Sequence, residues 1–459
     1  MSSNASRELV PLLMLTPYFA PQTHAAMFRA HKLAKYLPEH GFRPVVVTTD
    51  INYLYNEDPG LLEELPDCVQ VHRARFIEPT VRGLRMALGG RDRTFLAMKQ
   101  AGAYAAGPGR AAPSQAAARP PGRFSMAELV RVLGEWPDRH WTWAMAARGV
   151  CERLIREQDI KLLYTTAVPA SPLRLARRLQ RDHGLRWIAD FRDPVGYGQK
   201  HSARGLFNAA MERSLFATAM HSAEHVVGLA DAYGPIFFDL YGLPESRYSF
   251  IPTGLDQAYL DPAPPRQREP VLLHVGEVMP NQSRHVFAVL QRAHALRPQV
   301  MSAYRLELIG RREINQPRVE ALVSGLPDWP YETRFIDHLP QREVYARIRT
   351  AAACLLVPGH RRYWWTNFAK LVDYIALGVP VLADVPPVSE ARNELDKAGN
   401  GFFLGGEDVE RDAQALLAWV EAGLPIRTDD DYRARYTARR QAEDFARVFA
   451  RHAAGAAAP

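Results

Sequence analysis

Short apolar runs alternate with amphipathic stretches along nearly the whole chain. Each run reads as a buried strand, and the turn and helical spacing of apolar positions that follow it read as a helix. Alternating strands and helices predict parallel sheets covered by helices, an α/β architecture. The expected strands cover residues 11–16, 44–49, 160–166, 186–191 and 225–230 in the first half, and 271–276, 304–310, 332–339, 351–357 and 380–385 in the second.

A proline-rich stretch at residues 261–270 interrupts this alternation and predicts an interdomain linker. With 459 residues and 47% hydrophobic content, the chain is long enough for two α/β domains. We therefore expect an N-terminal Rossmann-like domain at 1–260, a second at 271–430, and a C-terminal helix at 431–459. Two such domains facing each other across a cleft would bring the strand ends of both to one ligand.

The first domain carries an insert around residues 76–130 that has no periodic pattern of apolar residues at its centre. From Arg82 to Arg123 eight basic residues stand against one acid, an excess of +7 that equals the net charge of the chain. One interpretation is a solvated, disordered insert. The other is a peripheral contact with anionic lipid head groups, because apolar residues are interleaved with the cations. Nucleic acid is disfavoured, since no recognisable reading motif accompanies the charge.

Residues 351–383 predict a strand, a polar loop, a helix that ends at Gly378, and a second strand. Helical spacing places Lys370 and Asp373 opposite the apolar stripe of this helix. A cation in the first turn is disfavoured by about 0.3–1 kcal/mol unless an anion binds there. A diphosphate held by Lys370, with Asp373 accepting hydrogen bonds from ribose hydroxyls, is one interpretation. A solvated Lys and Asp at i and i+3 is the other.

Further candidates follow other strands. Gly276 ends a strand, and Arg284 opens the next helix, where its guanidinium could bind the diphosphate or simply be solvated. Three charged residues of the first domain lie at the end of the strand at 186–191. An acid among them could orient an acceptor hydroxyl, or the group could form an Arg–Asp brace. Its members are Asp190, Arg192 and Asp193.

The remaining candidates are one histidine and three tryptophans. His24, in the opening loop, suits proton handling near neutral pH, although a lone loop histidine is usually solvated. Three tryptophans at 136, 141 and 143 are expected to pack a helix, with an acceptor or lipid contact as the alternative.

These motifs, in this order, resemble the retaining, nucleotide-sugar-dependent glycosyltransferases of family 4, which have the GT-B fold. The resemblance covers nearly the whole chain, and DFRDP together with KLVDY is typical of a subset of the family. The segments that carry it are Thr16–Thr49, Ala189–Val195, His274–Val286, Asn367–Ala383 and the terminal helix around Tyr436–Arg451.

The resemblance implies a donor site made by Gly276, Arg284, Asn367, Lys370 and Asp373. It also implies transfer with retention, by front-face attack in which the departing phosphate helps to take the acceptor proton. Two positions depart from the family pattern. Residues 22–25 replace the adjacent glycines of the opening turn, and Trp365 replaces the first of two glutamates that lie eight residues apart.

Composition limits the remaining possibilities. Three scattered cysteines, at 68, 151 and 354, suit neither a disulfide framework nor a zinc site and fit a reducing cytosol. The N-terminal apolar run is short and holds Pro11 and Pro17, so it predicts a first strand rather than a signal peptide. No stretch is apolar enough to span a bilayer. The acidic run at 429–431 reads as a helix start, so neither a metal nor another cofactor is expected.

The sequence therefore predicts a cytoplasmic enzyme, peripheral on the inner face of the membrane if the basic insert binds lipid. It would move a sugar from a nucleotide-sugar donor to a glycan or lipid-linked acceptor, in bacterial surface polysaccharide synthesis. Two alternative functions are compatible with the same two-domain fold. One is a non-catalytic nucleotide-sugar sensor or assembly subunit, favoured by the two departures, and the other is a sugar-nucleotide epimerase.

Overall fold

The computed structural model describes residues 9–23, 25–50, 57–79, 136–197, 203–260, 267–279, 283–326, 328–357 and 364–453. The chain divides into two compact units. Unit 1 contains residues 1–229, 234–251 and 442–459, and unit 2 contains residues 230–233 and 252–441. His24 and residues 80–135, which hold most of the predicted insert, lie outside the described residues.

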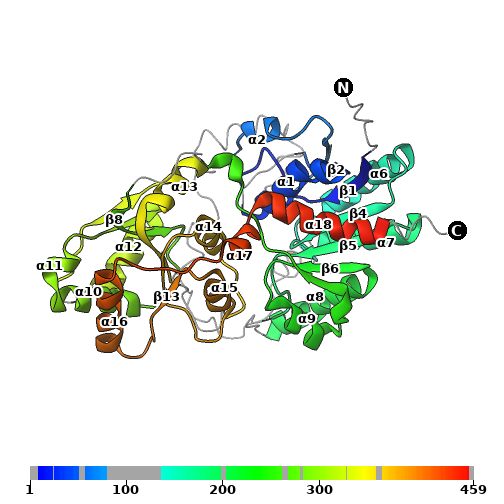
Figure 1. Ribbon diagram of the computed structural model, residues 1–459. Coiled ribbons are helices and arrows are strands. Elements are labelled where there is room, and N and C mark those ends of the chain that lie inside the picture. The colour runs from blue at the N-terminus through cyan, green and yellow to red at the C-terminus, as the bar shows by residue number, and fades with distance from the viewer. Residues whose placement is uncertain are drawn as a thin grey trace, which may run out of the picture. The chain divides into compact units, whose positions relative to one another are not determined.

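Unit 1 is built on a parallel seven-stranded sheet with the order β3-β2-β1-β4-β5-β6-β7 (Figure 1). Its registers are regular: Leu13 pairs with Val45 on one side and with Leu163 on the other. The strands are β1 (Val10–Leu15), β2 (Phe42–Thr49), β3 (Gln70–Ala74), β4 (Leu162–Ala167), β5 (Arg186–Phe191), β6 (His225–Gly228) and β7 (Tyr248–Phe250).

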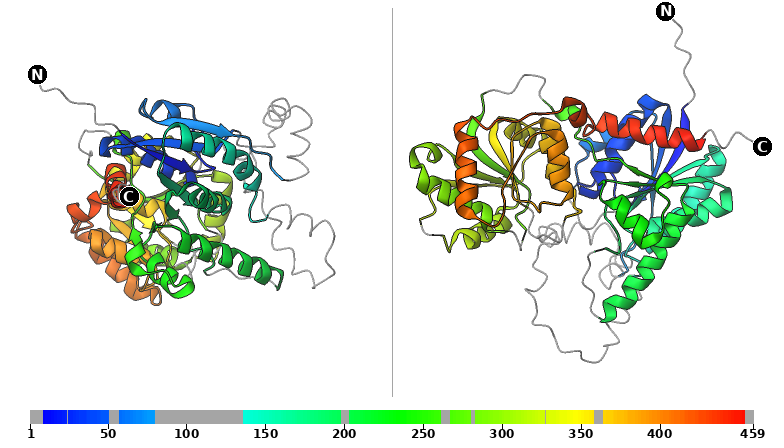
Figure 2. Two further views of the ribbon diagram at one scale, coloured as in Figure 1. Left: turned by 90° about the vertical axis from the view of Figure 1, so that its right-hand side faces the viewer. Right: turned by 60° about the horizontal axis from the view of Figure 1, so that its bottom comes forward.

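Helices cover both faces of this sheet. The helices α6 (Trp141–Glu157), α7 (Ser171–His183) and α8 (Ala203–Ser222) pack on one face, and Figure 2 shows the length of α8. On the other face lie α1 (Ala25–Tyr36) and α18 (Ala438–Ala453). The described residues of unit 1 also form the shorter helices α2 (Gly60–Glu63) and α9 (Tyr233–Tyr241) and 3-10 turns at Leu37–His40 and Glu245–Arg247.

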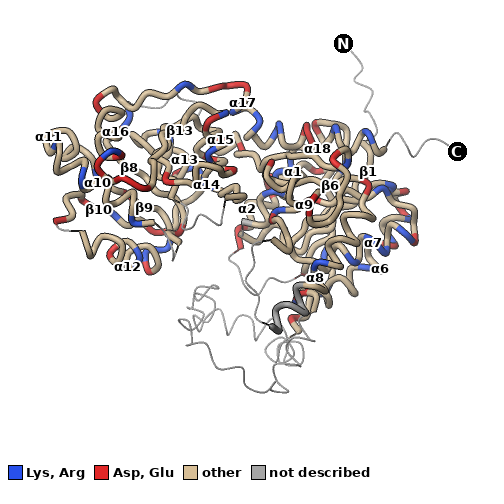
Figure 3. The backbone as a smooth tube through the Cα atoms, turned by 90° about the horizontal axis from the view of Figure 1, so that it is seen from below, with Lys and Arg blue, Asp and Glu red and all other residues tan. Residues whose placement is uncertain are grey.

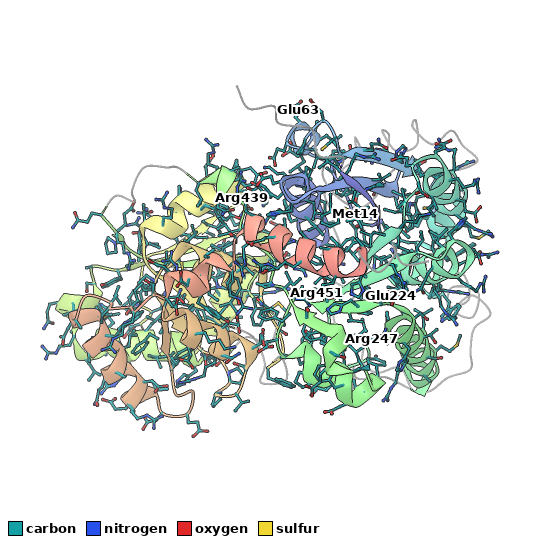
Figure 4. All side chains as sticks on the ribbon, turned by 45° about the vertical axis from the view of Figure 1, so that its right-hand side comes forward. Met14, Glu63, Glu224, Arg247, Arg439 and Arg451 are labelled. Atoms are coloured by element: carbon teal, nitrogen blue, oxygen red, sulfur yellow. The ribbon has the colours of Figure 1, made fainter. Side chains whose placement is uncertain are left out.

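The last helix completes the core of unit 1. Phe445 and Phe449 of α18 are fully buried, and both rings pack edge-on against the ring of Tyr164 in β4. At the C-terminal end of α18, Arg451 lies near Glu224 and Arg247 (Figure 4). His225 is buried there, and burial, with the nearby His452, Arg451 and Arg247, lowers its pKa to about 4.

Unit 2 has a parallel six-stranded sheet with the order β10-β9-β8-β11-β12-β13. The strands are β8 (Glu269–Val275), β9 (Arg305–Ile309), β10 (Thr333–Ile336), β11 (Ala351–Leu356), β12 (Val381–Ala383) and β13 (Gly401–Phe403). The helices are α10 (His285–Leu296), α11 (Pro298–Met301), α12 (Arg312–Val323), α13 (Gln341–Thr350), α14 (Ala369–Leu377), α15 (Glu390–Ala398), α16 (Val409–Glu421) and α17 (Asp430–Ala434), with a 3-10 turn at Gln257–Tyr259.

Two apolar clusters, one on each face, hold unit 2 together. Alternate strand residues point to opposite faces, so Leu272 joins the cluster beneath α10, α12 and α16, while Leu273 joins the one beneath α13, α14 and α15. Ala353 and Cys354 of β11 divide between the faces in the same way. The continuous apolar runs in the sequence therefore mark strands that are covered on both sides.

All ten predicted strands are present, with ends that differ by a few residues. The structure adds β3, β7 and β13. The first of them, β3, lies before the predicted insert. The linker predicted at 261–270 ends inside a strand, since its last two residues are the first two of β8. Among the described helices, none combines the length and the apolar character needed to cross a bilayer.

Candidate functional site

The strand order of unit 2 reverses between β8 and β11. From β8 the chain moves outward through β9 and β10, and then returns to the other side of β8 as β11. Ligands of open parallel sheets bind at such a reversal, just beyond the carboxyl ends of the strands. The segments that meet there are the turn after β8 and the amino end of α14, which follows β11.

Buried hydrogen bonds fix the conformation of the turn after β8. Gly276 has a φ of +91°, a left-handed conformation that glycine adopts without strain. The amide of Asn315, a fully buried residue of α12, donates to the Gly276 carbonyl at 3.1 Å. Its oxygen accepts from the Val278 N–H at 2.9 Å. Asn315 therefore fixes the path of the turn on both sides of Glu277.

Lys370 lies in the first turn of α14 and reaches back to β8. Its Nζ donates to Nε2 of His274 across 3.0 Å, and His274 is buried. Burial and the neighbouring ammonium lower the pKa of His274 well below its usual value, so the imidazole is neutral and can accept this bond. Burial also lowers the pKa of Lys370 to about 7, although Glu277 favours the charged form.

The amino end of α14 lacks a side-chain cap. Phe368 occupies the N-cap position in an extended conformation and has no polar atom to offer, so N–H groups of the first turn point outward. The side-chain oxygen of Thr366, just before the helix, is buried and has no hydrogen-bond partner among the described residues. Farther along, the Tyr374 hydroxyl accepts from the Val275 N–H at 3.2 Å and ties α14 to β8.

Asp373 contacts the neighbouring helix α13. Its carboxylate is hydrogen-bonded to the hydroxyl of Tyr345, a buried residue of α13, and the pKa of that hydroxyl is raised by burial and by Asp373. The sequence pattern placed both side chains away from the core, whereas the carboxylate packs α13 against α14. The structure therefore directs Lys370 toward β8 and Asp373 toward α13.

Arg284 contacts the neighbouring helix α12. It occupies the N-cap position of α10, and its Nε donates to the Leu322 carbonyl in α12 at 2.8 Å. A different arginine stands at the strand ends: Arg311, next to the end of β9, binds Glu277 with its Nε 2.7 Å from Oε1. Asn367 is half-buried and lies two residues before α14 begins.

In unit 1, Asp190 is an internal brace. Its two oxygens each accept a hydrogen bond from Arg29 of α1 at 2.8 Å, and Oδ2 also accepts one from the Tyr164 hydroxyl at 2.6 Å. Both Arg29 and Asp190 are buried, and the guanidinium lies over the ring of Phe445. The brace foreseen as an alternative is formed, but with Arg29 rather than with Arg192.

Arg192 and Asp193 lie beyond the carboxyl end of β5. Arg192 donates to the Val168 carbonyl, next to the end of β4. Asp193 is exposed. Its surroundings partly desolvate the carboxyl group and raise its pKa, and the neighbouring Arg192 acts in the opposite direction.

Sequence reasoning missed His274, Glu277, Arg311 and Asn315. The signal for two of them was present, because the segments HVGE and IGRR both place a charged residue directly after the glycine that ends a strand. No group of three or more His, Cys, Asp and Glu side chains that could hold a metal occurs in the part of the chain that the structure describes.

Comparison with known proteins identifies the fold. No protein-family model and no curated protein matches the chain in sequence. Sucrose-phosphate synthase from Thermosynechococcus elongatus superposes with a TM-score of 0.58 at 13% identity, over 97% of this chain and 100% of that one. A glycosyltransferase from Rickettsia africae gives 0.57 at 11%, over 96% and 98%. Anabaena HepE, solved with UDP and glucose, gives 0.55 at 14%, over 96% and 99%. The fold is GT-B, with two Rossmann-like domains.

Proposed function

We propose that the protein is a retaining glycosyltransferase, similar to family 4, that moves a sugar from a nucleotide-sugar donor to a glycan or lipid-linked acceptor. The observation that carries this proposal is the Lys370 ammonium, held by His274 at the uncapped amino end of α14. A cation at that end of a helix is unfavourable unless an anion binds. A diphosphate satisfies the ammonium and the free N–H groups together.

The protein's contribution to the chemistry follows from these groups. As the bond from the sugar to the diphosphate breaks, negative charge grows on the diphosphate oxygen, and donors fixed in advance stabilise that charge. Lys370 and the amino end of α14 are such donors. Anabaena HepE, which has the same fold, has been solved with UDP-glucose. We assign the donor diphosphate to unit 2 because Lys370 and His274 lie there.

Acceptor recognition is assigned to unit 1. Asp193 is exposed beyond the end of β5, where its carboxylate can orient an acceptor hydroxyl. Arg192 holds the neighbouring loop through the Val168 carbonyl. His24 is kept as a candidate from sequence alone. Front-face attack, a role in bacterial surface polysaccharide synthesis and a peripheral membrane location rest on the family resemblance.

A donor panel tests the proposal. Purified full-length protein is incubated with UDP-, GDP- and ADP-sugars, with and without an undecaprenyl-diphosphate-linked sugar, and released nucleoside diphosphate is measured. We expect one donor to be consumed, faster with acceptor present, and NMR of the product to show retained configuration. Binding of a donor without consumption, under all acceptor conditions, would instead identify a sensor. Conversion of the donor to an isomer without nucleotide release would identify an epimerase.

Chelation tests the proposal that no metal takes part. If fixed cations and helix N–H groups neutralise the leaving diphosphate, 5 mM EDTA should leave the turnover rate within about twofold, since a catalytic metal supplies several kcal/mol of charge stabilisation. Turnover is measured before and after chelation, and again after Mg²⁺ or Mn²⁺ is added back. A loss that either metal restores would contradict the proposal.

A further inference from the structure

A groove on unit 1 has no part in the proposed function. It lies between α7 and α8, has a volume of about 650 Å³ and is far larger than a single bound water. Volumes between about 300 and 1,000 Å³ are typical of small-molecule sites. Its lining residues come from α7, from α8 and from the segment before α6: Trp136, Leu173, Arg174, Arg177, Gln180 and Arg181 are among them, with Ser214, Leu215 and Thr218 opposite.

The wall formed by α7 is strongly basic. Four arginines line it, at positions 174, 177, 178 and 181, and no acidic residue does. Figure 3 shows the basic positions on α7. Asp182 pairs with Arg178 and Arg181 from beside the groove. No described carboxylate forms an ion pair with Arg174 or Arg177, and Arg174 lies over the ring of Trp136 at 4.9 Å.

These arginines destabilise α7 when the groove is empty. The arginines are spaced three and four residues apart, and each such like-charge pair destabilises a helix by about 0.2–0.5 kcal/mol. Arg174 ends the first turn of α7, and the Asp138 carboxylate already accepts a hydrogen bond from the Ser171 N–H at this end of the helix. A bound anion would offset the repulsion among the arginines.

The opposite wall supplies hydroxyl groups. Ser214, Thr218 and Ser222 follow one another at four-residue intervals along α8 and face the groove. The amide of Gln180 donates to the Ser222 carbonyl at 2.8 Å and fixes the two helices at one end. Guanidinium groups on one side and hydroxyl donors on the other match the oxygens of a phosphate group.

We propose that this groove binds a small phosphorylated molecule, at a site separate from the donor site of unit 2. A membrane surface fits less well, because interfacial binding needs protruding apolar side chains. The apolar floor is recessed: Leu173 and Ala219 are 1% and 3% exposed. The groove offers a recessed pocket with a basic wall, which suits a soluble ligand.

Calorimetry with inorganic pyrophosphate at constant ionic strength tests this proposal. The starting protein is full-length Lys370→Met, which removes the ammonium of the donor site, so that remaining binding reports the groove. Adding Arg174→Gln and Arg177→Gln should weaken pyrophosphate binding at least tenfold and should not lower the unliganded melting temperature. Thr218→Val, which keeps every charge, should weaken binding several-fold. The matched control, Arg153→Gln with Arg156→Gln on α6, should change affinity less than twofold.

Three results would overturn the proposal. One is pyrophosphate affinity that is the same in the groove variant and in its parent. Another is equal loss in the control pair, which would indicate a general effect of net charge. The third is binding of the parent to phosphatidylglycerol vesicles, abolished in the groove variant, without any pyrophosphate binding, which would identify a membrane contact. Donor turnover is read separately, so failure of one proposal leaves the other standing.

Discussion

Replacement of Lys370 by methionine is expected to lower kcat/KM for the nucleotide sugar by about 10²–10³-fold, the usual cost of removing one fixed donor to a developing negative charge. The wild-type protein should also bind nucleoside diphosphate less tightly as the pH rises above 7. The pKa of Lys370 is about 7 because of burial, so the free protein loses this charge there. Affinity should fall by up to tenfold per pH unit, until the pKa of the complex is reached.

Titration of nucleoside diphosphate from pH 6 to 9 measures this effect. Lys370→Arg, which keeps its charge throughout, should give a flat profile above pH 7, where the terminal phosphate of the nucleotide is already ionised, and Lys161→Met on the surface of unit 1 serves as the control. A wild-type affinity that is constant over this range would remove Lys370 from diphosphate binding.

The folding stability of the protein should rise with pH, whereas its affinity for nucleoside diphosphate falls. The folded protein releases the Lys370 proton near pH 7 and the unfolded chain near 10.5, so stability should rise with pH between these values. Lys370→Met should therefore melt at a higher temperature than wild type at pH 6.

Replacement of Asp190 by alanine is expected to lower the free energy of unfolding of unit 1 by about 3–5 kcal/mol, because it leaves the Arg29 guanidinium buried without its partner. The Tyr164 hydroxyl loses its acceptor as well, and its pKa, which burial and Asp190 raise well above the usual value, shows that it is present as the neutral donor. Hydrogen exchange of peptides from β4 and β5 would measure the loss locally.

Two comparison variants separate stability from catalysis. Asp193→Ala, at an exposed position, should change stability by less than about 0.5 kcal/mol while it raises KM for the acceptor. The double variant Arg29→Met with Asp190→Leu, which removes both charges, should regain most of the stability lost in Asp190→Ala. If Asp190→Ala is inactive but exchanges hydrogen like wild type, its carboxylate acts in the reaction and not as a brace.

The fold was predictable because the apolar runs are long and local. Strands buried on both faces, such as β2 and β11, need continuous apolar residues, and these are visible in the sequence. The strands that were missed are short or half-exposed: β13 has three half-buried residues, and β3 lies at the edge of its sheet. Local composition carries little signal for such strands, since their pairing depends on neighbours that are distant in sequence.

For the candidate site residues, the sequence predicted the positions on helices and strands but not the side-chain partners. Helical spacing and the turn at Gly378 located Lys370 correctly in the first turn of α14. Its partner His274 precedes it by 96 residues, and Arg29 precedes Asp190 by 161. The side-chain partners of Arg284 and Asp373 could not be predicted either. Their backbone positions followed from the pattern, whereas the direction of each side chain is set by Leu322 and Tyr345 on other helices.

The place of α18 has a consequence for biosynthesis. Unit 1 begins with β1, yet Phe445 and Phe449, which close its core over Tyr164, are translated after the whole of unit 2. At roughly 5–20 residues per second, the ribosome needs about ten seconds or more to make the intervening 190 residues. We therefore expect the face of the sheet around Tyr164 to stay uncovered during that time and to be a binding site for holdase chaperones.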